Sequence, residues 1–294
     1  MWSRKKYSLT IVFLGVALLF CLLLNISLGS VSIPFSEVIA SLTGLAVEKE
    51  TWRYIIVEFR LPKALTAIIT GSGLAVSGLL MQTLFRNPLA GPYVLGLSSG
   101  ASLGVAIVFM GSALFGAGFA AILLSKWSLV IASSLGSLLV LLAVIVASLR
   151  LRDTMAILII GLMFASFTAA IVSVLAYFSP AADLQQYIFW SYGSLGNLSW
   201  EEVSILAIFW TAGILITLAS IKNLNSLLLG EQYAKSMGTN IKRNRFLVIL
   251  ATSLLAGSIT AFAGPIAFIG LTVPRPQLLR LHPLQLMVVI MQVM

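Results

Sequence analysis

The chain has 294 residues, of which 60% are hydrophobic and only 9% are charged. Soluble globular domains carry about 25% charged residues, so this composition excludes a soluble domain and indicates that lipid is the main solvent. At about 20 residues per membrane helix, the length allows roughly eight to ten spans in one domain. The one cysteine, Cys21, lies in the first apolar segment and cannot form a disulfide within the chain.

The apolar segments predict about eight membrane helices. In chain order they cover about residues 8–28, 61–84, 93–112, 127–149, 154–178, 203–221 and 246–263, and a short eighth helix begins at Gly264. The first segment is longer than a signal-peptide core, so we expect it to be retained as a helix. A short surface helix is expected to open at Pro34. The predicted fold is therefore all-α: a polytopic membrane helix bundle with short surface helices.

Glycine recurs through the second and third predicted spans, in residues 66–104. In a soluble helix each interior glycine costs about 0.5–1 kcal/mol relative to alanine. In a bilayer, small side chains instead let two helices approach closely. We therefore predict two closely packed membrane helices joined by the short polar turn Arg86-Asn87-Pro88.

The distribution of charge predicts the orientation. With the N-terminus in the cytoplasm, thirteen of the 18 basic residues fall on the inner face and seven of the nine acidic residues on the outer face. This is the bias expected for loops that stay on the cytoplasmic side. The net charge of +9 then reports topology and attraction to anionic inner-leaflet lipid, and it requires no nucleic acid partner.

Residues that would support catalysis are scarce. The only histidine is His282, and no second metal ligand pairs with it in sequence. The chain contains no G-x-x-x-x-G-K-[ST] loop for binding nucleotide phosphates. No carboxylate lies in the middle of a predicted span, which disfavours an internally ion-coupled transporter. We expect no enzymatic activity, no metal site and no cofactor bound by this chain.

Two segments have features that a generic membrane protein does not explain. In the hydrophilic loop 223–240, Gly230 and Gly238 bracket about two helical turns, which predicts either a short helix free to dock on the inner face or a solvated loop. In 264–274, glycine and proline recur at membrane depth, where irregular backbone must be covered by protein or face a water-filled cavity. That segment is either a pathway-lining or closely packed element, or a simple kink.

Four motifs, taken in order, carry a family resemblance. They are Arg60-Leu61-Pro62-Lys63 with the glycines and the Asn87-Pro88-Leu89-Ala90 turn that follow, Trp190 with Gly193-Ser194-Leu195, the loop 229–245, and Gly264-Pro265-Ile266 through Pro274. Over about residues 1–274 the chain resembles the permeases of ABC importers for iron–siderophore chelates, haem and vitamin B12. The resemblance implies a ten-helix plan and a permease domain spanning residues 1–274.

The resemblance also implies partners: a second permease subunit, the same or paralogous, a cytoplasmic ATPase dimer that holds the ATP, and an extracytoplasmic solute-binding protein. A ferric siderophore is the first expected substrate, in the cytoplasmic membrane of a bacterium. The implied ATPase-coupling residues are Leu227, Leu229, Gly230, Glu231, Ala234, Met237, Gly238 and Arg243. The candidate pathway or helix-packing residues are Gly71, Gly78, Gln82, Asn87, Pro88, Gly96, Gly100, Gly161, Gly264, Pro265 and Gly270.

Two further expectations concern the outer face and the fifth span. Arg53 and Arg60 are candidate salt-bridge partners for a binding protein, although an exposed pair contributes only about 0–1 kcal/mol. Residues 161–170 are a candidate pathway wall whose small side chains fit helix packing equally well. A secondary transporter or channel that works without an ATPase is the alternative function.

The resemblance breaks after Pro274. The segment 275–294 is atypical, and its last apolar piece, 284–294, is about half a bilayer span. A frameshift or truncation would give this pattern and would remove the family's final two helices. On this reading the chain inserts in the membrane but transports poorly or not at all, and a non-functional remnant is a further alternative. Comparing chelate uptake with and without a restored tail tests this expectation.

Overall fold

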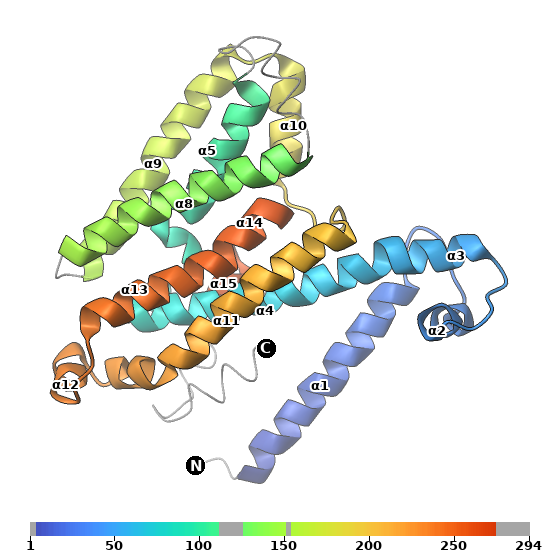
Figure 1. The fold of residues 1–294 in the computed structure, drawn as a ribbon, viewed down its shortest axis with the longest axis horizontal. Coiled ribbons are helices and arrows are strands. Elements are labelled where there is room, and N and C mark those ends of the chain that lie inside the picture. The colour runs from blue at the N-terminus through green and yellow to red at the C-terminus, as the bar shows by residue number, and fades with distance from the viewer. Residues whose placement is uncertain (1–3, 112–125, 151–153, 275–294) are drawn as a thin grey trace. The chain divides into compact units, whose positions relative to one another are not determined.

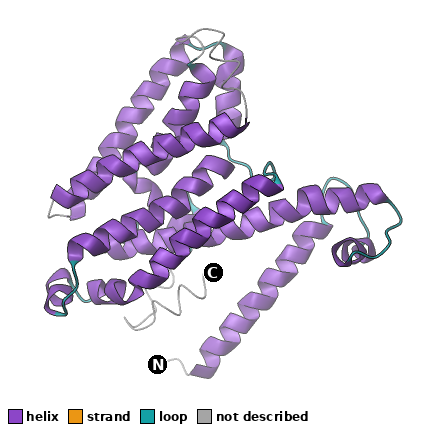
Figure 2. Cartoon of the chain, viewed as in Figure 1, coloured by secondary structure: helices purple, strands orange, loops and turns teal. Residues whose placement is uncertain are grey.

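The computed structural model describes residues 4–111, 126–150 and 154–274 (Figure 1). Every regular element in these ranges is a helix, as Figure 2 shows. The predictions for His282 and for the segment 275–294 lie outside the described residues. The chain forms two compact parts, one comprising Met1–Ile68 with Leu195–Ser204 and the other Ile69–Ser194 with Ile205–Met294.

The first part contains α1 (Arg4–Ser27), α2 (Phe35–Thr43), α3 (Glu50–Ile55) and the start of α4 (Leu61–Phe85). Helix α2 begins directly after Pro34, where the sequence predicts a short surface helix. The core of this part is a small apolar cluster formed by Ile26, Ile33, Val38, Ile56 and Ala64. It fixes the C-terminal end of α1 against the residues that lead into α4.

Helix α4 begins at Leu61, as the sequence predicts, but the chain is already helical before that residue. A π-helical turn, Ile56–Arg60, joins α3 to α4, so one helix runs without a break over Glu50–Phe85. Pro62 lies inside it and has no N–H to donate, so the carbonyl of Glu58 loses its usual helical partner. A π-turn next to the proline accommodates this loss, which is why Pro62 does not end the helix.

The second part carries the remaining elements. A 3-10 turn, Pro92–Leu95, leads into α5 (Leu97–Met110). Then follow α8 (Lys126–Arg150), α9 (Thr154–Phe178), α10 (Ala181–Ser191), α11 (Trp200–Leu228) and α12 (Glu231–Ser236). Helix α13 (Ile241–Thr252) continues through the π-turn Ser253–Gly257 into α14 (Ser258–Ala263), and α15 (Ile269–Thr272) is the last described helix.

Among the described residues, five helices are long and apolar enough to cross a membrane: Glu50–Phe85, Trp127–Ala147, Ala156–Phe178, Trp200–Leu228 and Ile241–Ala263. Two shorter apolar helices, Val12–Ser27 and Leu97–Met110, coincide with the first and third predicted spans. In place of an eighth span, the described residues after Gly264 contain only the short helix α15. The predicted helical membrane bundle is therefore confirmed, and the count of about eight spans stays a prediction.

Glycines on α5 allow a close helix contact in this part. A Cβ atom added at Gly100 would lie 2.5 Å from the carbonyl oxygen of Gly136, and one added at Gly104 would lie 2.0 Å from that of Ala132. Both partners belong to α8, so the backbones of α5 and α8 touch with no side chain between them. Small residues four apart are how membrane helices achieve such contact. The glycines of α5 therefore pack on α8, not on α4 as the sequence suggests.

Candidate functional site

The predicted coupling loop contains one short helix, α12. Gly230 precedes it with φ 123°, and Gly238 follows it with φ 80°. Both angles lie in the left-handed region that favours glycine, so these two residues permit the sharp turns that set α12 apart from α11 and α13. Leu227, which the sequence places in the coupling helix, is instead in the last turn of α11.

The loop divides into a buried and an exposed side. Leu227, Ala234 and Ile241 form a small buried cluster that holds α12 against the ends of α11 and α13. Leu229 and Met237 are 52% and 59% exposed. Arg243 is also exposed, and its backbone N–H donates to the side chain of Asn240, which caps the start of α13. The segment thus presents apolar side chains next to basic ones.

Two arginines hold this loop in place. The Arg86 guanidinium donates to the carbonyl oxygen of Leu227 at 2.9 Å, and this carbonyl, in the last turn of α11, also accepts from the backbone N–H of Gly230 at 3.1 Å. The Arg245 guanidinium forms an ion pair with the Glu231 carboxylate at 2.7 Å. Sequence reasoning missed this pair, although Glu231 is the only acidic residue between Lys222 and Arg245.

The motif at 264–274 meets two of the other motifs. Gly264 has φ 79° and lies against Gly193, since a Cβ atom on Gly264 would be 2.7 Å from the Gly193 Cα. The backbone N–H of Ser194 donates to the carbonyl of Ala263 at 2.8 Å. The Trp190–Gly193 element and the Gly264–Pro265 element therefore form one tightly packed junction in which neither glycine can carry a side chain.

The same segment packs on α4. A Cβ atom on Gly78 would lie only 1.7 Å from the carbonyl oxygen of Gly270. One turn further along α4, the Gln82 side-chain amide donates to the carbonyl of Leu271 at 3.0 Å. The Tyr93 hydroxyl accepts a hydrogen bond from the backbone N–H of Ile266 at 3.3 Å. These contacts pair two backbone groups of the segment with α4 and with Tyr93, while the short helix α15 pairs others within the segment.

The turn after α4 is polar and compact, as predicted. The Asn87 side chain accepts a hydrogen bond from the backbone N–H of Leu89 at 2.9 Å, and the Asn87 carbonyl accepts one from Ala90 at 3.0 Å. Arg86 adopts φ 48°, a rare value for a residue other than glycine. Pro88 is exposed at the tip of the turn. This geometry directs the Arg86 side chain toward Leu227.

The candidate pathway wall on α9 divides into two faces. Gly161 and Ala165 lie against Gly96, where a Cβ atom would be 3.0 Å from the Gly161 carbonyl oxygen. Met163 and Phe167 are 65% and 62% exposed. The first face is therefore used for helix packing on the residues before α5, and the second face is open in this chain.

The two candidate arginines of the outer face differ. Arg53 is exposed, whereas Arg60 is buried and donates to the carbonyls of Ile26, Ser27 and Val31. These carbonyls lie at and just beyond the end of α1. Backbone carbonyls there have no N–H partner within the helix. The expectation that Arg60 pairs with a binding protein does not fit this geometry, because its guanidinium is already occupied. Arg53 remains available.

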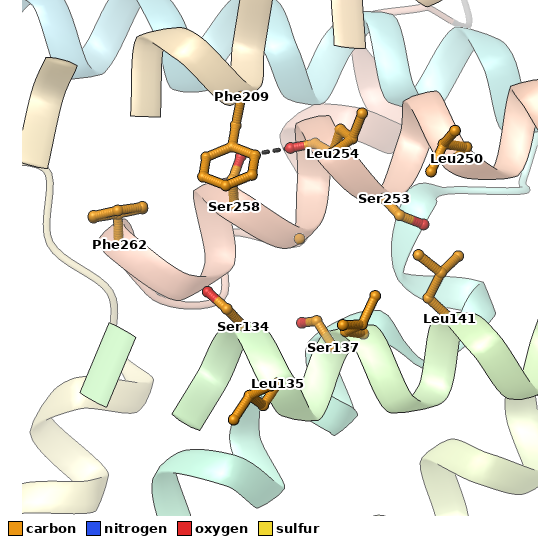
Figure 3. Close-up of a pocket in the computed structure, with 12 residues that line it drawn as sticks. Ser134, Leu135, Ser137, Leu141, Phe209, Leu250, Ser253, Leu254, Ser258 and Phe262 are labelled. Atoms are coloured by element: carbon orange, nitrogen blue, oxygen red, sulfur yellow. Dashed lines mark hydrogen bonds between the residues drawn. The ribbon is translucent and has the colours of Figure 1, made fainter. Parts of the chain in front are cut away.

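A pocket of about 260 Å³ lies between α8, α11 and the α13–α14 helix (Figure 3). Its lining residues are leucines, phenylalanines, serines and one glycine. The hydroxyls of Ser137, Ser253 and Ser258 donate to backbone carbonyls at 3.1, 2.7 and 2.5 Å. The pocket is therefore an apolar recess whose lining carries no acid, base or metal ligand. Its residues come from three separate helices, so no sequence motif predicts it.

The described geometry is that of a multi-pass helical membrane protein: long apolar helices, backbone-close helix contacts, and one short helix on an exposed loop. The model of the FecCD transport family matches residues 17–284. The chain therefore belongs to the FecCD transport family, and it is a membrane-spanning ABC transporter permease.

Relatives and solved structures agree with this assignment. The hemin transport system permease protein HmuU of Yersinia pestis is 32% identical over 273 residues, which cover 92% of this chain and 79% of HmuU. The vitamin B12 import system permease protein BtuC of Vibrio cholerae is 34% identical over 286 residues, which cover 95% of this chain and 77% of BtuC. A structure described as an inward-facing metal-chelate type ABC transporter matches with a TM-score of 0.81 at 26% identity, covering 97% of this chain and 86% of the other.

Proposed function

We propose that this chain is the membrane-spanning permease subunit of an ATP-driven importer that carries a ferric siderophore across the bacterial cytoplasmic membrane. Haem and cobalamin are the neighbouring substrates, since relatives at 32% and 34% identity are named for hemin and vitamin B12 transport. The chain itself binds no ATP in this scheme. A separate ATPase supplies the energy of transport.

The observation that carries the proposal is the exposed apolar surface of the α12 loop. Leu229, Tyr233 and Met237 are 52%, 50% and 59% exposed on a loop that is otherwise hydrophilic. Apolar side chains clustered on an aqueous loop cost free energy unless a protein partner covers them. Lys235, Lys242 and Arg243 border them, so the surface suits a partner that offers an apolar cleft with acidic edges.

The proposed importer function also implies further partners and an orientation in the membrane. The α12 loop faces the cytoplasm, the N-terminus lies on the same side, and the basic bias of the inner loops supports this. A second permease subunit completes the pathway, and an extracytoplasmic binding protein delivers the chelate to the outer face, where Arg53 is exposed. The exposed face of α9, with Met163 and Phe167, is open to the second subunit or the pathway.

The test is co-purification of the full chain with its cognate ATPase. The substitution Met237→Asp places a charge in the apolar surface, and we expect at least a tenfold loss of bound ATPase, equivalent to about 1.4 kcal/mol. Leu45→Asp is the matched control, because Leu45 is 62% exposed on the loop between α2 and α3. No ATPase with the unsubstituted chain would contradict the proposal and favour a secondary transporter or channel.

Orientation and substrate need separate measurements. We expect a thiol introduced as Ser236→Cys, in a Cys21→Ser background, to react with a membrane-impermeant reagent only after the cells are opened. Uptake of ferric siderophores, hemin and cobalamin by the complete complex then identifies the substrate. Labelling of position 236 from outside intact cells would contradict the cytoplasmic placement of α12.

A further inference from the structure

The α12 loop is tied to the rest of its compact part through side chains from two different elements. Arg245, in α13, pairs with Glu231 at the start of α12 at 2.7 Å. Arg86, in the turn after α4, donates at 2.9 Å to the carbonyl of Leu227, which lies in the last turn of α11 just before α12. In Figure 1, α12 lies beside the start of α13 and the end of α11, at the same end of this part. A displacement of α12 therefore acts directly on α13, and it reaches α4 only through the end of α11.

The ion pair is the stronger of the two links. The Arg245 side chain is only 5% exposed, while Glu231 is 36% exposed. Because the Arg245 charge is buried, removing its Glu231 partner is far more costly than losing an exposed pair. The apolar support of α12 is slight by comparison, because its one buried residue is Ala234, with a single methyl group.

Both links lead to the same place, the segment 264–274. Through α4, the path ends where Gly78 touches Gly270 and Gln82 donates to the Leu271 carbonyl. Through α13, the helix continues by way of the π-turn Ser253–Gly257 and α14 to Gly264. The segment is thus attached at one end to α14 and on its side to α4.

We propose that the Glu231–Arg245 pair transmits the motion of α12 to α13 and so to the segment 264–274, with Arg86 as the second anchor. This inference rests on the proposed function, since the motion of α12 comes from the docked ATPase. Glu231 and Arg245 are positioning residues: they touch neither nucleotide nor substrate. The pair makes α12 and α13 move together, whereas a loop held only by backbone turns at Gly230 and Gly238 would bend at those turns.

The experiment measures whether motion of α12 reaches the segment 264–274. Phe268 is 71% exposed in the segment, so Phe268→Cys in a Cys21→Ser background gives a single reactive thiol. The rate of maleimide labelling is measured on the complete complex with its ATPase, with and without ATP. With the pair intact, we expect ATP to change the labelling rate. With Glu231→Gln, we expect the ATPase to stay bound and the ATP-dependent change to fall about tenfold, within the usual range of coupling between sites.

The charge swap separates a transmitting pair from a merely structural one. Glu231→Arg together with Arg245→Glu is expected to restore at least half of the ATP-dependent change that each single substitution removes. Lys222→Gln is the matched control, because Lys222 is an exposed cation on α11 outside both the pair and the docking surface, and it should leave the change intact. An unchanged response in Glu231→Gln, or loss of ATPase binding in that variant, overturns the inference. Absence of ATPase from the unsubstituted complex instead contradicts the proposed function.

Discussion

The contact between α4 and the segment 264–274 makes a sharp prediction at Gly78. In the substitution Gly78→Ala, the new Cβ atom would lie 1.7 Å from the carbonyl oxygen of Gly270, whereas real Cβ contacts are essentially never under 3.0 Å. The two backbones must therefore separate by at least about 1.3 Å (3.0 less 1.7). That shift also stretches the nearby hydrogen bond from Gln82 to the Leu271 carbonyl, now 3.0 Å long.

The size of the effect follows from three contributions. Overpacking costs about 1–3 kcal/mol. The weakened hydrogen bond costs about 0.5–1.5 kcal/mol. Replacing glycine by alanine inside a helix gains back about 1 kcal/mol. The net loss of folding free energy is about 0.5–3.5 kcal/mol, which at roughly 2–4 °C per kcal/mol lowers the melting temperature by several degrees.

The assay is thermal unfolding of the purified chain in detergent, with Gly71→Ala as the control. Gly71 lies in the same helix, but a Cβ atom there would have no neighbour within 4 Å. Gly71→Ala should therefore keep or slightly raise the melting temperature. A melting temperature for Gly78→Ala equal to or above that of Gly71→Ala would refute the close contact between α4 and Gly270.

Three further predictions use the same measurement. Arg60→Met should cost about 2–5 kcal/mol, because three carbonyls lose a charged donor, whereas Arg53→Met at an exposed position should cost almost nothing; equal effects would contradict the buried role of Arg60. Gly264→Ala should destabilise more than Gly238→Ala, since both have a positive φ near 80° but only Gly264 also meets Gly193; the reverse order would rule out the tight junction. Gln82→Glu should destabilise more than Gln82→Met, because a carboxylate cannot donate to the Leu271 carbonyl and would be buried, and a higher melting temperature for Gln82→Glu would count against that hydrogen bond.

The positions of the membrane helices could be predicted from the sequence because hydrophobicity is a local property. A run of apolar residues must leave water wherever its neighbours lie, so the fifth span was predicted to within a residue or two as α9. The same holds for α12, since Gly230 and Gly238 permit its turns through their own backbone angles. The π-turn before Pro62 was not predicted. Whether a helix continues through a proline depends on how the residues around that proline pack.

The partners of each element could not be read from the sequence. The glycines of α5 signal a close approach, but only the fold shows that their partner is α8. Arg60 looks like an outer surface cation, yet it caps α1 from inside the protein. A motif states which residue types recur, whereas a contact between residues far apart in sequence depends on how the helices assemble.

The sequence by itself determined that this is a helical membrane protein and where its long apolar helices lie, because solvation acts on each segment separately. Only the tertiary structure decided that Glu231 pairs with Arg245 and that 264–274 joins the motifs around Gly78 and Gly193. Those contacts exist because buried charges and open backbone groups must find partners at short distance, and the chain supplies them from distant positions.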